Sequence, residues 1–157
     1  AGGPLIDKFA REGKPRAFPV TKPKVDGLNF SFSGLKTQIL YFVQKNVALN
    51  PNFIEENKAD ICASIQYTII NILMDKLKLA VAETGINQIA IGGGVSANSG
   101  IRTTLKEAEK KYGWKTYIPK FEYTTDNAAM IGIVGYYNFL EENFSNAEIT
   151  SKARIEF

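Results

Sequence analysis

The chain of 157 residues is long enough for one domain with a buried core, and 45% of its residues are hydrophobic. Nineteen Lys and Arg residues against 16 Asp and Glu residues give a net charge of +3, which excludes an acidic disordered tail and a wholly basic nucleic-acid wrapper. The sequence has no His and one Cys, so this chain alone cannot build a Ser-His-Asp triad, a Cys-His pair or a His- or Cys-based zinc site.

The first half of the chain is predicted to hold helices separated by irregular segments. A short helix should follow the turn at residues 2–4 and end at Gly13. Residues 14–24 contain three prolines and cannot form a regular helix. Residues 28–32 alternate apolar and polar side chains, which predicts a half-buried strand, and the apolar spacing after residue 35 predicts an amphipathic helix to about residue 46.

The second half predicts alternating helices and strands. A long helix over residues 53–84 should stop at Gly85, and a strand at 88–91 runs into the glycine-rich stretch 92–98. The remaining expected elements are a helix ending near 112, a strand at 115–118 and a final helix at 127–142. That last helix is apolar on nearly all sides, so we expect it to be buried. The order predicts an α/β fold in which helices cover a small sheet of three short strands.

The strongest candidate site is the stretch at residues 92–98 (GGGVSAN), where an apolar strand ends and a helix follows. Glycines let a ligand approach the backbone closely, and free N–H groups at a helix start attract phosphate or carboxylate. The expected ligand is therefore a nucleotide phosphate. The pattern matches neither the common dinucleotide nor the P-loop fingerprint. The alternative is a tight turn in which the glycines serve packing and Ser96 or Asn98 caps the helix.

Asp126 is a second candidate, because it is a lone carboxylate at a predicted helix start. Its simple interpretation is an N-cap, and its functional interpretation is a metal ligand or a ribose contact. A metal ion needs three or four ligands, and this chain offers no imidazole to complete such a set. Any co-ligands would therefore come from outside the sequence.

A third candidate is the corner at residues 30–37 (FSFSGLKT), whose hydroxyls and lysine could contact an anion. The simpler interpretation is that Ser33 caps the following helix while Phe30 and Phe32 pack inward.

Positive charge is concentrated in two segments. Residues 1–24 and 101–120 each hold six cations and two anions, whereas residues 121–157 hold two cations and six anions. The basic stretches at 14–24 and 102–120 are candidates for contact with an RNA phosphate backbone, with Tyr112 and Trp114 adding stacking. The alternative is that they are solvated surface.

Cys62 cannot form an internal disulfide, so we expect a cytoplasmic protein in which Cys62 is a small core residue. No stretch approaches the ~18–20 apolar residues of a membrane-spanning helix, and no export leader is recognised, so no membrane association is expected. Because the chain begins at Ala1 without Met, we expect a processed or excised piece in which Ala1 is a cloning remnant.

Four motifs resemble, in order and spacing, those of the TsaD family: residues 2–4 (GGP), 30–37 (FSFSGLKT), 93–98 (GGVSAN) and 125–130 (TDNAAM). These proteins are tRNA N6-adenosine threonylcarbamoyltransferases, formerly called O-sialoglycoprotein endopeptidases or glycoproteases. The resemblance covers the C-terminal half of a family member. It implies that residues 1–157 form one C-terminal lobe of an actin-like or Hsp70-like ATPase (ribonuclease-H-like) fold, without the family's N-terminal lobe.

The resemblance also implies a site. In the family, two histidines of an N-terminal HxxxH motif and the aspartate of the TDNAA motif hold a divalent metal ion, iron or zinc. By this match Asp126 is a metal ligand and catalytic residue, and the two histidines are absent. The family's glycine loop contacts the nucleotide part of threonylcarbamoyl-AMP. The implied nucleotide- and substrate-binding residues are Gly93, Gly94, Asn98, Gly2 and Gly3.

The implied reaction moves a threonylcarbamoyl group from its adenylate to N6 of the adenosine next to the anticodon in certain tRNAs. The implied partners are tRNA, threonylcarbamoyl-AMP or another adenine nucleotide, an inert TsaD-like paralogue and a P-loop ATPase, and an isolated lobe is expected to self-associate. We expect this chain alone to be inactive. The alternatives are a non-catalytic nucleotide-binding or scaffold lobe, like the inert paralogue, and a metallopeptidase, which the residues support poorly.

Overall fold

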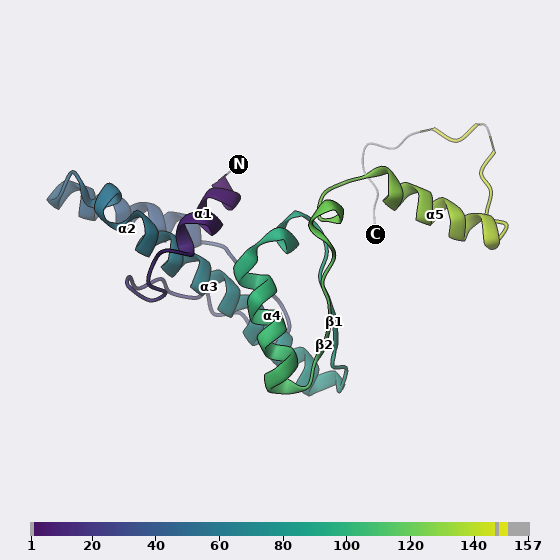
Figure 1. Ribbon diagram of the computed structural model, residues 1–157, viewed down its shortest axis with the longest axis horizontal. Helices are drawn as coiled ribbons and strands as arrows, with labels where there is room; N and C mark the ends of the chain where they lie inside the picture. Colours follow the sequence, from purple (N-terminus) through teal and green to yellow (C-terminus); the bar gives the residue numbers. More distant parts are fainter. Residues whose placement is uncertain (1, 147, 151–157) are drawn as a thin grey trace.

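The computed structural model describes residues 2–146 and 148–150, and it is helix-rich with a small sheet (Figure 1). The elements in chain order are α1 (Gly2–Ala10), α2 (Leu35–Leu49), α3 (Phe53–Thr84), β1 (Gln88–Ala90), the 3-10 helix η1 (Gly94–Ala97), α4 (Ser99–Tyr112), β2 (Lys115–Tyr117), the 3-10 helix η2 (Phe121–Tyr123) and α5 (Ala128–Leu140). The mixed α/β class agrees with the sequence-based expectation.

The long helix α3 is the support on which α1, α2 and α4 pack. It ends as predicted, because Gly85 adopts a φ of +70° and its N–H bonds to the carbonyl of Val81. α1 approaches α3 closely through the turn that follows it. A Cβ at Gly13 would lie 2.0 Å from the backbone oxygen of Ala59, so only glycine fits there.

Two hydrophobic clusters lie along α3. The first joins α3, α4 and the strands, and its buried members are Met74, Ile101, Leu105, Ala108 and Trp114. The second joins α3, α2 and the segment after α1, and its buried members are Phe53, Ile61 and Ile65. In the second cluster the rings of Phe18, Phe42 and Phe53 pack with centroids 5.2–5.9 Å apart.

The sheet has two parallel strands among the described residues, rather than the three that the sequence predicts. β1 and β2 pair with Ile89 opposite Thr116, and the N–H of Ile91 extends the ladder to the carbonyl of Tyr117. α4 connects them, which forms a βαβ unit. Ile89, Ile91 and Ile118 pack on the first cluster, so the helices cover one side of this small sheet.

The strand predicted at residues 28–32 is wrong, because this segment forms turns and irregular backbone. Phe30 and Phe32 are 51% and 43% exposed, so the expectation that they pack inward is also wrong. Ser33 does not cap α2 either, since Gly34 occupies the N-cap position without a side-chain bond. An alternating segment becomes a strand only where a neighbouring strand accepts its hydrogen bonds, and the described residues provide none for it.

The predicted burial of the last helix is wrong as well. No residue of α5 is buried, and large apolar side chains such as Ile131, at 77% exposed, project from all round it. Figure 1 shows α5 extending away from the other helices, joined to them by the chain that follows β2. The apolar pattern indicates a helix that belongs in a core, but the described part of the chain does not surround it.

Cys62 of α3 is half-buried and not in either core cluster, so the expectation of a core residue is wrong, and burial raises the pKa of its thiol. Within the described residues, no helix is both long and apolar enough to cross a membrane.

Candidate functional site

The glycine-rich loop of residues 92–98 follows β1 and leads into α4, as predicted. Gly93 has a φ of +74°, which residues with side chains rarely adopt, so the turn requires glycine there. A Cβ added at Gly92, Gly93 or Gly94 would meet no atom within 4 Å. Packing therefore does not account for the glycines at 92 and 94, and the open face leaves room for a ligand to approach the backbone.

Ser96 and Asn98 hold the loop from inside. The buried Ser96 donates from Oγ to the carbonyl of Gly93 at 2.7 Å, which closes the turn. Asn98 is the N-cap of α4, because its Oδ1 accepts the N–H of Ile101 at 3.0 Å. Its Nδ2 donates to Oε1 of Gln66 in α3 at 2.7 Å. The capping interpretation of Asn98 is therefore confirmed, and a ligand contact through its amide would compete with Gln66.

Asp7 of α1 is a site residue that the sequence reasoning missed. It is 8% exposed, and its carboxylate accepts the Oγ–H of Ser99 at 2.7 Å and the N–H of Ser99 at 3.2 Å. Arg11 donates to the same carboxylate at 3.1 Å. The N-terminus of α4 is thus already occupied by a carboxylate of this chain, as its dipole favours. A ligand phosphate could still bind the amides of the glycine loop, but not the N-terminus of α4.

The pKa of Asp7 reflects this bonding. Burial alone would raise the pKa, but hydrogen bonds from the Ser99 side chain, Arg11, the Ser99 amide and Gln66 together hold it below its ordinary value. A carboxyl whose pKa falls on folding contributes stability above its unfolded pKa, about 4, and this contribution is lost as the pH drops through the lower folded value.

We expect Asp7→Asn to lower the free energy of unfolding by about 2 kcal/mol at neutral pH, because two charge-assisted bonds to Ser99 and one to Arg11 are weakened. Urea denaturation at neutral pH and below about pH 4 measures this, and the difference from the parent chain should shrink in acid. Glu12→Gln at an exposed carboxylate is the control and should change little. A difference that does not depend on pH would contradict the assignment.

Gly2 and Gly3 lie in the first turn of α1, exposed and with open space around each α-carbon. They start the helix that carries Asp7 to Ser99. The structure thereby brings α1 and the glycine loop to the same end of α4.

Arg102 joins the glycine loop to the segment that leads to Asp126. Its guanidinium donates to the carbonyl of Ser96 at 3.0 Å and to the carbonyl of Pro119, and it lies 4.1 Å from the ring centroid of Phe121. The end of β2 is therefore fixed against the loop by one side chain from α4.

Asp126 lies between η2 and α5, and its side chain is exposed. The N-cap interpretation is wrong, because Asn127 caps α5 by accepting the N–H groups of Ala129 and Met130. Among residues 2–146 and 148–150, no group of three or more His, Cys, Asp or Glu side chains is placed to hold a metal ion. The described residues therefore do not form a metal site by themselves.

Comparison with known proteins finds the same family by two routes, a family model and individual relatives. The sequence model of a family described as "TsaD: tRNA N6-adenosine threonylcarbamoyltransferase" matches residues 1–133. Relatives named tRNA N6-adenosine threonylcarbamoyltransferase occur in Christiangramia forsetii, 66% identical over 99% of this chain, and in Cytophaga hutchinsonii, 51% identical over 98%. A relative of the same name in Clostridium beijerinckii is 42% identical over 99% of the chain.

The match covers only part of each relative. It takes in 46% of the Christiangramia forsetii protein and 45% of each of the other two. The chain thus spans about half the length of the curated relatives that it matches.

Proposed function

The chain belongs to the TsaD family of tRNA N6-adenosine threonylcarbamoyltransferases, and we propose on this premise that it is part of an enzyme that transfers threonylcarbamoyl from threonylcarbamoyl-AMP to tRNA. The observation that carries the proposal is that all four motifs, including those at 93–98 and 125–130, fall inside the family match over residues 1–133. The acceptor is N6 of the adenosine next to the anticodon. That amine attacks the carbamoyl carbon, the bond from this carbon to the phosphate oxygen breaks, AMP leaves and N6 loses a proton.

We propose further that the described residues are part of the C-terminal lobe of an actin-like fold. The support is the βαβ unit of β1, α4 and β2, with the glycine loop at the carboxyl end of β1. Ligands of α/β sheets commonly bind at that edge. The exposed apolar surface of α5 supports a larger core than the described residues make.

In this proposal the glycine loop holds the AMP part of the donor. The open face over Gly93 and Gly94 supports close approach of a phosphate to the backbone, and positioning the donor removes part of the entropic barrier to transfer. Asn98 shapes the loop from below as the cap of α4. Gly2 and Gly3 lie on the helix that reaches the same end of α4.

Asp126 is proposed as one ligand of a divalent metal ion, iron or zinc. Its exposure leaves the carboxylate accessible, but the described residues supply no complete set of ligands beside it. The remaining ligands would have to come from another part of the enzyme.

The proposed partners are tRNA, an inert TsaD-like paralogue and a P-loop ATPase, in the cytoplasm. The uncovered aromatic and aliphatic side chains of α5 support contact with further protein, self-association of this chain included.

A chimera tests the proposed function. In the Christiangramia forsetii relative, the matching 156 residues are replaced by this chain. With threonylcarbamoyl-AMP, unmodified tRNA and the relative's own partner proteins, we expect transfer of labelled threonylcarbamoyl to tRNA, because 66% identity preserves most contacts with the rest of the enzyme.

The relative without those 156 residues is the control and should be inactive. A folded chimera that binds AMP but transfers nothing would favour the non-catalytic scaffold alternative and count against the proposal.

A further inference from the structure

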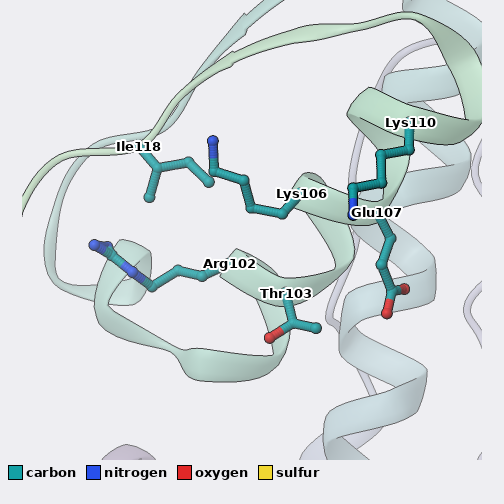
Figure 2. Close-up of a pocket in the computed structure, with 6 residues that line it drawn as sticks. All are labelled: Arg102, Thr103, Lys106, Glu107, Lys110 and Ile118. Atoms are coloured by element: carbon teal, nitrogen blue, oxygen red, sulfur yellow. The ribbon is translucent and has the colours of Figure 1, made fainter.

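One face of α4 carries a row of cations beside an open depression. Arg102, Lys106 and Lys110 are four residues apart, so they stack along the helix at intervals of about 6 Å. Together with Thr103, Glu107 and Ile118 they line a depression of about 470 Å³ (Figure 2). Figure 2 shows the side chains of Arg102 and Lys106 extending toward the side where Ile118 lies.

The charge of this face is positive after its internal contacts are counted. Arg102 bonds to two backbone carbonyls, which are neutral, so its charge is not cancelled. Lys106 lies 3.2 Å from Glu109, a carboxylate that also accepts both the N–H and the hydroxyl of Thr116. Glu107 is the one carboxylate that lines the depression, against three cations. An anion is the ligand that this surface favours.

Two cations of the other basic stretch, residues 14–24, contact side chains of α3. In residues 14–24, Arg16 donates to the hydroxyl of Tyr67 at 2.7 Å, and Lys22 lies 2.6 Å from Asp75. Both contacts fasten this stretch along α3. The α4 face differs in that three of its cations line one open depression.

The shape of the depression indicates the class of anion. It is an open depression on the surface, whereas small-molecule sites are concave and enclose most of their ligand. Trp114 is 6% exposed within the first cluster, so it is not free to stack on a base. One guanidinium and two ammonium groups in a row suit the repeated phosphates of a phosphodiester backbone.

We propose that the face formed by Arg102, Lys106 and Lys110 binds the phosphate backbone of the tRNA substrate. This inference rests on the proposed function for the identity of the RNA. Arg102 fixes the position of this face relative to the glycine loop through its bond to the carbonyl of Ser96. Lys106 and Lys110 make the phosphate contacts.

The test compares the chimera with its Lys106→Ala/Lys110→Ala variant. Arg102 is left intact because it fixes the loop. The probe is a fluorescein-labelled, unmodified tRNA transcript with adenosine next to the anticodon, titrated by anisotropy between about 50 and 200 mM salt. We expect about tenfold weaker binding and a salt slope smaller by about two, since each phosphate contact contributes about one unit. The KM for tRNA should rise by a similar factor with kcat unchanged.

Lys45→Ala/Lys58→Ala is the matched control, with one lysine on α2 and one on α3. Equal loss of binding in both double variants, or no loss in the α4 variant, would overturn the proposal. Polyglutamate is a second probe. If it binds the parent as tightly as tRNA and loses the same affinity in the α4 variant, the face binds acidic protein instead. If the parent chimera transfers nothing while the α4 variant still loses tRNA binding and salt slope, the proposed function fails and the phosphate-binding face stands.

Discussion

Leu105→Ala is expected to lower the free energy of unfolding of this chain by about 3–4 kcal/mol. Leu105 is 1% exposed and lies on α4 in the first cluster, between α3 and the strands. It also borders an apolar cavity of about 160 Å³ between α3 and α4. The space left by the shortened side chain would add to that cavity, and the expected penalty lies within the range of about 2–5 kcal/mol for such substitutions.

Urea denaturation followed by circular dichroism measures this loss as a shift of the midpoint at constant slope. Leu79→Ala is the matched control, because Leu79 lies on the same support helix α3 but is 37% exposed. Its loss should be about 1 kcal/mol or less. Similar losses for both variants would mean that α4 is not packed on α3 as described.

Asp126→Asn in the chimera is expected to lower transfer by about 100-fold or more while leaving the melting temperature unchanged. Removing one carboxylate charge from a proposed metal-ligand position impairs the reaction directly. The side chain is exposed, and no hydrogen bond to it occurs among the described residues, so its loss has little effect on folding. Initial rates of labelled threonylcarbamoyl transfer measure the first effect, and thermal unfolding measures the second.

Glu122→Gln is the control, since Glu122 is an exposed carboxylate in η2 four residues earlier. It should transfer at the parent rate. Full activity of Asp126→Asn would remove the catalytic and metal-ligand assignments of Asp126.

The elements with strong local signals could be predicted from the sequence. The apolar stripe of α3 and its stop at Gly85, the apolar strand before the glycine loop and the cap at Asn98 all depend on residues a few positions apart. Asp7 could not be found in this way, because Ser99, its partner, lies 92 positions further along the chain. The one local indication was that Asp7 is an acidic residue beside the apolar face of the short helix α1.

Two of the wrong predictions have the same cause, which is that a local pattern does not identify the segment that packs against it. Residues 28–32 alternate like a strand, which needs a hydrogen-bonded neighbouring strand, and α5 is apolar like a core helix, which needs other elements to bury it. Neither pattern shows which part of the protein provides that strand or that covering surface. The described residues leave both segments exposed.

The length of α3 has a mechanical consequence. Its 32 residues form a continuous rod of about 48 Å, and both hydrophobic clusters are built on it. The two clusters meet at consecutive residues, Ile69 in one and Ile70 in the other. Unfolding the middle of α3 would therefore remove packing residues from both clusters. The glycine-loop end and the α2 end are thereby coupled, and heat should melt them in one cooperative transition.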